Sequence, residues 1–215
     1  MALRIPVVVS LTLLALSAPL ASLAQTPEPI GDAKRGHALS YTCNGCHAVP
    51  NYKNVYPTYS VPKLHGQRPE YLVAALKAYK SGERSHGTMH SQASSMSEQD
   101  MKDIAAYLSG PNVLTQSKND APATSRPKAS EVCLACHGTN GVGITADYPT
   151  IAGQHKDYIE RALHDYQKGG RKNAVMGGMA ATLKPEDIEQ LAEYYSKQSP
   201  ALDTVRKKNF FFSSN

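Results

Sequence analysis

The chain carries one five-residue pattern twice, as Cys43-Asn44-Gly45-Cys46-His47 and as Cys133-Leu134-Ala135-Cys136-His137. Its 215 residues include four cysteines, and all four fall within these two copies. Because no cysteine lies elsewhere, a disulfide framework linking distant elements is not expected. The histidine that directly follows each cysteine pair also needs an explanation, which a disulfide within the pair does not provide.

A cysteine pair with two residues between its members and a histidine directly after it is typical of covalent haem c attachment. Two thiols on one turn reach the two vinyl groups of a haem, and the histidine is placed under the iron. The sequence therefore predicts two haem c groups. The predicted thioether residues are Cys43, Cys46, Cys133 and Cys136, and the predicted axial histidines are His47 and His137.

Two other uses of these cysteines are weaker. A structural zinc site needs four cooperating cysteine or histidine ligands, and repeated pairs in an exported chain match that requirement poorly. A thioredoxin-like redox pair needs a surrounding βαβ pattern, and neither copy has one.

Beyond the cysteines, the chain repeats itself at an offset of 87 residues. Pro62-Lys63-Leu64-His65-Gly66-Gln67 corresponds to Pro149-Thr150-Ile151-Ala152-Gly153-Gln154. The same register pairs Tyr71 with Tyr158, Leu76 with Leu163, Tyr79 with Tyr166, Gly82 with Gly169, Arg84 with Arg171, Met89 with Met176, Asp100 with Asp187 and Tyr107 with Tyr194. The cysteine patterns lie 90 residues apart, so the first copy carries three extra residues before Pro62. Two copies of about 90 residues indicate two small domains and not a solenoid.

The N-terminus has the features of a secretory signal. Arg4 supplies a positive charge, residues 5–16 form an apolar run, and Ser22-Leu23-Ala24 is a small-x-small cleavage site. An uncleaved membrane anchor is the alternative, but the run is shorter than the ~20 residues that a membrane span needs. We expect cleavage after Ala24 and a mature protein of 191 residues in the periplasm.

The composition divides the chain into five parts: residues 1–24 as signal peptide, 25–110 as a first domain, 111–129 as a linker, 130–200 as a second domain and 201–215 as a basic, aromatic tail. The linker is rich in proline, serine and charge, which favours extended chain. The formal charge of +5 is spread along the sequence, so nucleic-acid binding is not expected. Docking on the protein, contact with a membrane surface and disorder all stay open for the tail.

Helical periodicity dominates both copies. The stretch Pro69 to Lys80 begins with a proline at a first-turn position and places its apolar residues on one face. Asp32 to Tyr41 is a further predicted helix, Ser97 is placed to cap another, and Pro185 begins the corresponding helix of the second copy. Pro127 leaves about one turn before the second cysteine pattern, so that copy lacks a long helix there. No stretch alternates as a strand does, and the predicted fold class is all-α.

A haem iron also needs a sixth ligand or an open position. Met89 lies 42 residues after His47 and Met176 lies 39 residues after His137, and the difference equals the three-residue insertion. A methionine sulfur opposite a histidine raises the potential of the iron and suits it to electron transfer. We predict Met89 and Met176 as axial ligands, each in a glycine-containing stretch outside the helices.

Other candidate ligands lie close to these methionines. His86 and His90 flank Met89 but do not recur in the second copy, and either would lower the potential of the first haem. Met179 lies three residues past the second predicted ligand, but its counterpart is Gln92, so it stands outside the repeat. Packing in the core is the common alternative role of a methionine.

The neighbouring residues also have predicted roles. Pro149 lies twelve residues after His137, where its carbonyl oxygen can accept a hydrogen bond from Nδ1–H of that histidine. Pro62 is the matching residue after His47, and an ordinary turn proline is the alternative at both positions. The first copy holds three tyrosines near its insertion that we expect to pack and not to relay electrons: Tyr52, Tyr56 and Tyr59.

Together, these features resemble the dihaem cytochrome c4 family, a tandem of two class I cytochrome c domains. The resemblance covers residues 30–112 and 128–200, through the cysteine patterns, the two proline-to-glutamine segments, and the stretches 89–107 and 176–194. It implies two small helical domains, each around one haem, that face each other across a pseudo-two-fold interface. It also implies exchange of electrons between the haems, in a protein similar to the electron donors of terminal oxidases.

We therefore expect an electron carrier without substrate chemistry of its own, working between an upstream reductase or bc1-type complex and a terminal oxidase. Basic residues near a haem edge would steer an acidic partner, and peripheral membrane attachment stays open. The alternative is a dihaem subunit of a larger oxidoreductase, of the flavocytochrome c sulfide dehydrogenase type. A dihaem enzyme, such as a peroxidase or thiosulfate dehydrogenase, is a third class.

Overall fold

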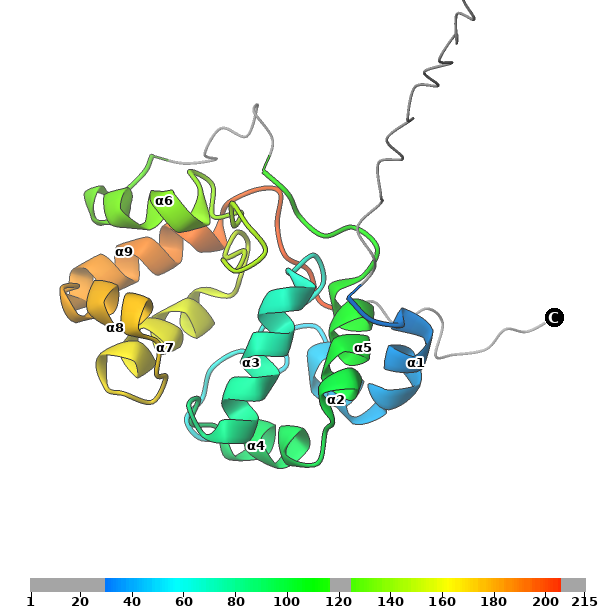
Figure 1. Cartoon of the computed structure of the whole chain (residues 1–215). Coiled ribbons are helices and arrows are strands. Elements are labelled where there is room, and N and C mark those ends of the chain that lie inside the picture. The colour runs from blue at the N-terminus through cyan, green and yellow to red at the C-terminus, as the bar shows by residue number, and fades with distance from the viewer. Residues whose placement is uncertain (1–29, 117–124, 206–215) are drawn as a thin grey trace, which may run out of the picture.

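The computed structural model describes residues 30–116 and 125–205, and this part of the chain is helical without any strand. Its helices gather into two lobes that follow one another along the sequence (Figure 1). The first lobe holds α1 (Ala33–Leu39), α2 (Tyr41–His47), α3 (Pro69–Ser81), α4 (Gly87–Ser94) and α5 (Glu98–Ser109). The second lobe holds the 3-10 helix η1 (Lys128–Cys133), α6 (Leu134–His137), α7 (Lys156–Gln167), α8 (Ala174–Ala181) and α9 (Pro185–Ser196). The predicted all-α class is confirmed.

The helix ends follow the sequence signals. Proline stands in the first turn of both α3 and α9, where its missing N–H costs nothing. Gly82 ends α3 with a φ of 80°, a left-handed conformation that favours glycine. Ser97 and Asp100 form a capping box at the start of α5, with each side chain bonded to the other's backbone N–H. The predicted starts of these three helices are confirmed.

The segment before the second cysteine pattern differs from its counterpart in the first lobe. In the first lobe, α1 begins after Asp32 and α2 carries the cysteines. The corresponding described segment of the second lobe, residues 125–137, has only η1 and the four-residue helix α6. Pro127, the residue before η1, has an extended conformation. The expected absence of a long helix is confirmed.

The prediction that the two candidate methionines lie outside helices was wrong. Met89 lies in α4 and Met176 lies in α8. The residue before each helix is extended and accepts a hydrogen bond from the methionine backbone N–H: His86 through Nδ1 at 3.2 Å and Asn173 through Oδ1 at 2.9 Å. These side chains satisfy an otherwise unpaired helix-terminal donor, and they allow a helix to begin in a glycine-rich stretch.

Each lobe has its own apolar core. The first is built mainly from α3 and α5, and its buried residues include Leu72, Leu76, Met101, Ile104 and Leu108. The second lies between α7 and α9 and includes Ile159, Leu191, Ala192, Tyr194 and Tyr195. The helical periodicity of the sequence therefore places these side chains inward, as an amphipathic helix requires.

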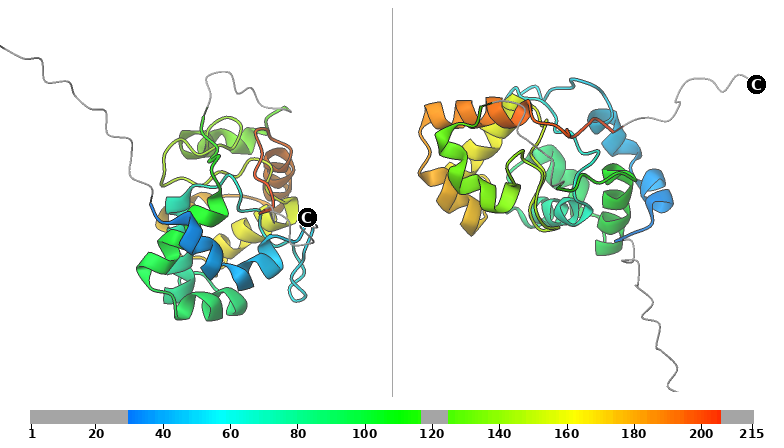
Figure 2. Two further views of the ribbon diagram at one scale, coloured as in Figure 1. Left: turned by 90° about the vertical axis from the view of Figure 1, so that its right-hand side faces the viewer. Right: turned by 90° about the horizontal axis from the view of Figure 1, so that it is seen from above.

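The chain after α9 crosses back from the second lobe to the first (Figure 2). Val205 is 3% exposed and belongs to the core of the first lobe. Asp203 and His65 exchange backbone hydrogen bonds, both 3.0 Å long. Residues 201–205 therefore connect the two lobes, and residues 206–215 of the predicted tail lie outside the described residues. The predicted signal peptide and residues 117–124 of the predicted linker also lie outside them.

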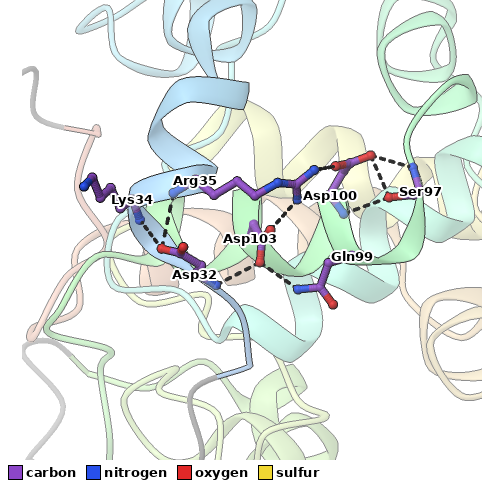
Figure 3. Close-up of polar contacts among 7 residues, drawn as sticks. All are labelled: Asp32, Lys34, Arg35, Ser97, Gln99, Asp100 and Asp103. Atoms are coloured by element: carbon purple, nitrogen blue, oxygen red, sulfur yellow. Dashed lines mark hydrogen bonds and ion pairs between the residues drawn. The ribbon is translucent and has the colours of Figure 1, made fainter.

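A group of polar side chains fastens α1 to α5 in the first lobe (Figure 3). Arg35 of α1 forms ion pairs with both Asp100 and Asp103 of α5. Asp103 has a side chain only 1% exposed and also accepts the backbone N–H of Asp32 at 2.8 Å. A buried carboxylate needs such partners, because an unpaired one would be costly to remove from water.

None of the described helices is long and apolar enough to cross a membrane.

The prediction that the three tyrosines near the insertion pack was right for one of them. Tyr59 is 8% exposed, and its ring centroid lies 6.4 Å from that of Tyr158 in the second lobe. Tyr52 and Tyr56 are instead 43% and 96% exposed. The difference arises because the loop returns to the interface only at its end, where Ser60 donates hydrogen bonds to Asp157 of the second lobe.

Candidate haem sites

The first candidate site is a cavity of about 1120 Å³, a volume that includes its opening to solvent. Its walls come from α2, α3, α4 and α5, and they include Cys43, Cys46, His47 and Met89. Nδ1–H of His47 donates to the carbonyl oxygen of Pro62 at 3.0 Å, as predicted. The structure thus brings all four predicted side chains of the first copy to one cavity.

The second candidate site is a cavity of about 970 Å³, measured in the same way. Cys133, His137 and Met176 line it. Nδ1–H of His137 donates to the carbonyl oxygen of Pro149 at 2.9 Å, again as predicted. Cys136 is not part of this lining, although it lies on α6 directly before the histidine.

Both histidines are prepared to act as neutral ligands. Burial lowers the pKa of His47 and of His137, because it disfavours the charged imidazolium. The hydrogen bond to a proline carbonyl opposes this effect in part and fixes the proton on Nδ1. Nε2 is thereby left with its lone pair, and the ring is held in one orientation, which is how a second hydrogen bond prepares a metal-ligating histidine.

The competing ligands of the first site have other hydrogen-bond partners. His86 lines the first cavity, but its Nδ1 accepts the backbone N–H of Met89. Nδ1–H of His90 donates to the carbonyl oxygen of Tyr79 at 2.8 Å, and this residue is not part of the cavity lining. Met179, the competitor in the second site, does line its cavity and is 41% exposed.

The side chains of both cavities fit a covalently bound haem. Each copy of the repeat supplies thiols that form no disulfide, an imidazole whose Nδ1 is bonded to a proline carbonyl, and a methionine on another helix. Burial raises the pKa of the Cys43 and Cys133 thiols, as an apolar wall does. Among the described residues, no three His, Cys, Asp or Glu side chains come together as a metal site, which leaves the zinc interpretation without support.

The two cavities share a wall at the interface between the lobes. Tyr71 of the first lobe and Tyr158 of the second line both of them. The second cavity is also lined by Pro62, Lys63, Leu64 and Gln67 of the first lobe. Each site is therefore completed by residues of the other copy, which the sequence alone did not predict.

Two glutamines join the lobes in a symmetric way. The side-chain amide of Gln67 donates to the Thr150 carbonyl oxygen at 2.8 Å and accepts the Thr150 backbone N–H at 2.9 Å. Gln154 makes the same pair of bonds with the backbone of Lys63, at 3.0 and 2.9 Å. Both glutamines were visible as a match at the 87-residue offset, which is the signal that points to them. These contacts define a pseudo-two-fold axis between the copies.

Comparison with known proteins gives the family. Residues 33–110 match the protein family described as "Cytochrome c", and residues 121–194 match "Cytochrome C oxidase, cbb3-type, subunit III". A cytochrome c4 from Pseudomonas aeruginosa is 32% identical over 178 residues, which are 76% of this chain and 87% of that protein. This chain belongs to the cytochrome c4 family.

Further similarities agree with this assignment. The crystal structure of reduced recombinant cytochrome c4 from Pseudomonas stutzeri aligns with a TM-score of 0.60 at 29% identity, over 78% of this chain and 99% of that one. A protein named thiosulfate dehydrogenase electron acceptor, from Stutzerimonas stutzeri strain A1501, is 27% identical over 186 residues, 77% of this chain and 82% of its own. The cytochrome c4-family chain is accordingly a dihaem electron carrier with two covalent haem c groups.

Proposed function

We propose that this cytochrome c4-family protein is a periplasmic carrier that takes electrons from an upstream reductase and delivers them to a terminal oxidase. His47 and Met89 hold the first iron in this proposal, and His137 and Met176 hold the second. Cys43, Cys46, Cys133 and Cys136 form the thioethers. The family match of the second lobe to an oxidase subunit and the export features of residues 1–24 support the proposal.

The shared wall of the two cavities is the observation that carries the proposal. Tyr71 and Tyr158 contact both sites, so the two cofactors bind next to each other and not at opposite ends of the molecule. When bound, haem supplies an iron that cycles between the ferric and ferrous states. In each lobe, a histidine and a methionine from two separate elements would hold the iron, and a backbone carbonyl oxygen fixes the histidine ring. With both axial positions taken by side chains, no position on the iron is open to a substrate.

A second candidate function comes from one relative's name. The electron-acceptor relative of thiosulfate dehydrogenase covers both lobes of this chain. In that role, the protein would receive electrons from a separate enzyme that oxidises thiosulfate, and the same two haem irons would accept them. This function differs from the proposed one in the donor. A subunit role in a larger oxidoreductase of the flavocytochrome c type remains the alternative from the sequence.

Stopped-flow mixing tests the proposed function. The chemically reduced protein is mixed with a terminal oxidase, and the oxidised protein is mixed in parallel with thiosulfate dehydrogenase and thiosulfate. Rapid oxidation by the oxidase, slowed by added salt as expected for charge-steered association, supports the proposed role. Rapid reduction only in the thiosulfate arm favours the second candidate.

Mass spectrometry of the exported protein tests the location, and a mature N-terminus at Gln25 is expected.

A further inference from the structure

A buried hydroxyl on the wall of the second cavity has no hydrogen-bond partner. Tyr195 of α9 is 2% exposed, and its hydroxyl oxygen is buried without a partner in residues 30–116 and 125–205. The same residue lines the second cavity. Keeping a hydroxyl away from water without a hydrogen bond is costly, so a partner is expected to form when this cavity is filled.

The other buried polar atoms of this kind lie away from the cavities. Among the described residues, five further side chains hold a buried polar atom without a partner, and none of the five lines either cavity: Ser40, Asn44, Arg68, Ser109 and Arg161. The Tyr195 hydroxyl therefore differs from them in its place beside a cofactor site.

The Tyr195 side chain is held in one position by its neighbours. Its backbone carbonyl oxygen accepts the Gly153 N–H at 2.8 Å, and its ring meets that of Tyr194 edge-on, with the centroids 4.9 Å apart. Gly141 lies against the same ring, since a Cβ at this position would come within 2.8 Å of the Tyr195 ring carbon Cδ1. The hydroxyl is therefore fixed at one point of the cavity wall.

The candidate acceptor is the sulfur of Cys133, the first predicted thioether residue of the second lobe. Cys133 lines the same cavity and packs against the core cluster that contains Tyr195. Burial raises the pKa of its thiol, and the Tyr195 hydroxyl opposes this rise, so the two groups lie near each other without yet satisfying hydrogen-bond geometry. A thioether sulfur carries lone pairs and no hydrogen, so it can only accept.

The first lobe has no hydroxyl at the equivalent position. Leu108 lies 87 residues before Tyr195 in the repeat, and it lines the first cavity. The same place in the wall is thus polar in one site and apolar in the other. Any effect of the Tyr195 hydroxyl on a cofactor should therefore be specific to the second site.

We propose that the Tyr195 hydroxyl donates a hydrogen bond to the thioether sulfur of Cys133, and that this bond raises the reduction potential of the second haem alone. The inference rests on the proposed function, in that Cys133 carries a haem. The positive end of the O–H dipole points toward the sulfur and the attached haem. Positive potential there favours the ferrous state, because the ferric iron carries one more positive charge. Hydrogen bonds and the polarity of the surroundings tune metal centres in this way.

Redox titration of the full-length holoprotein tests this proposal, and haem methyl resonances in NMR spectra separate the two haems. Tyr195→Phe removes the hydroxyl and keeps the ring. We expect it to lower the reduction equilibrium of the second haem about threefold, which corresponds to about 28 mV, and to leave the first haem unchanged. Incorporation of 3-fluorotyrosine in place of Tyr195 makes the hydroxyl a stronger donor with little change in size, and it is expected to raise the same potential.

Tyr194→Phe is the matched control on the same helix. Tyr194 is 3% exposed, donates to the Thr139 carbonyl oxygen at 2.7 Å, and lines neither cavity. This variant is expected to lower the melting temperature more than Tyr195→Phe does and to leave both potentials unchanged. The pair of variants therefore separates a loss of stability from a change of potential.

NMR spectra of the reduced protein report the hydrogen bond itself. We expect a Tyr195 hydroxyl proton that is protected from exchange with water and shows a nuclear Overhauser effect to the Cys133 Hβ protons. This signal is expected to disappear in Tyr195→Phe and to persist in Tyr194→Phe.

The contradicting results are distinct. Unchanged potentials in Tyr195→Phe, no rise with the fluorinated residue, or equal shifts at both haems each overturn the proposed hydrogen bond and leave the haem assignment standing. A wild-type protein with fewer than two haems per chain, or with no methionine–iron band, overturns the proposed function itself.

Discussion

At single residues, the two copies reach the same geometry with different side chains. His86 and Asn173 stand at equivalent positions in the repeat, and each accepts the backbone N–H of the candidate methionine ligand. The matched spacing of the two copies is the basis for predicting Met89 and Met176 as ligands, and this stays a prediction. It was not enough to show that they start helices, because a histidine at a helix N-terminus is a weak sequence signal.

A substitution at position 86 separates the capping role from the ligand role. His86→Asn installs the residue that the second copy uses, and we expect the stability and the methionine–iron band to stay unchanged. His86→Ala removes the acceptor at the start of α4 and is expected to lower the free energy of unfolding by about 0.5–2 kcal/mol while the band persists. Thermal unfolding and near-infrared spectra measure the two effects, and loss of the band in His86→Asn would make this histidine a ligand.

At the scale of elements, the two copies differ by one helix, and charged side chains hold this extra helix to the first lobe. α1 has no counterpart in the described second lobe, and the polar group around Asp103 holds it to α5 (Figure 3). The sequence predicted a helix over Asp32 to Tyr41, within which α1 lies, and the start of α5 from Ser97. It did not predict their contact, since a carboxylate on a helix is far more often solvated than buried.

Acid should weaken this contact. Hydrogen bonds from Arg35 and from the Asp32 backbone lower the pKa of Asp103 below its ordinary value. A lowered pKa in the folded state stabilises the protein above the unfolded pKa, near 3.9, and this contribution is lost as the pH falls through the folded value. We expect Asp103→Asn to cost about 1–3 kcal/mol at pH 7, and the difference from wild type in thermal unfolding to shrink as the pH falls below about 3.9.

The control lies on the same helix. Glu98 pairs with Lys77, but both side chains are about half exposed, so water and salt weaken the pair. Glu98→Gln is expected to change the melting temperature much less than Asp103→Asn. Equal effects of the two variants, or a difference that does not depend on pH, would contradict the account of the α1–α5 contact.

At the scale of the molecule, the interface depends on matched residues that only the three-dimensional structure brings together. The repeat places Gln67 and Gln154 at equivalent positions. It does not show that the two copies contact each other, because a contact between copies produces no periodic pattern in the sequence. For the same reason, the sequence did not predict that Tyr71 and Tyr158 each line both cavities. The candidate haem-binding side chains could be proposed from the sequence, because covalent attachment requires cysteines and a histidine at fixed spacing within each copy.

Removing one glutamine should loosen the interface from one side. Gln67→Ala leaves the Thr150 N–H and carbonyl without partners, and Thr150 is 1% exposed. We expect a loss of about 1–3 kcal/mol and faster hydrogen exchange of the Thr150 amide. Gln190→Ala, at an exposed position of α9, serves as control. Unchanged protection of the Thr150 amide in Gln67→Ala would show that the glutamines do not hold the lobes together.

The central claim is that the chain is an electron carrier that holds two haems, each with a histidine and a methionine as axial ligands. Spectroelectrochemical titration of the purified protein, read at the methionine–iron charge-transfer band, tests it most directly. The account predicts band intensity for two haems and positive potentials for both, with Met89→Ala and Met176→Ala each removing half of the band and lowering one potential. A low-potential haem without the band in the wild-type protein would contradict it.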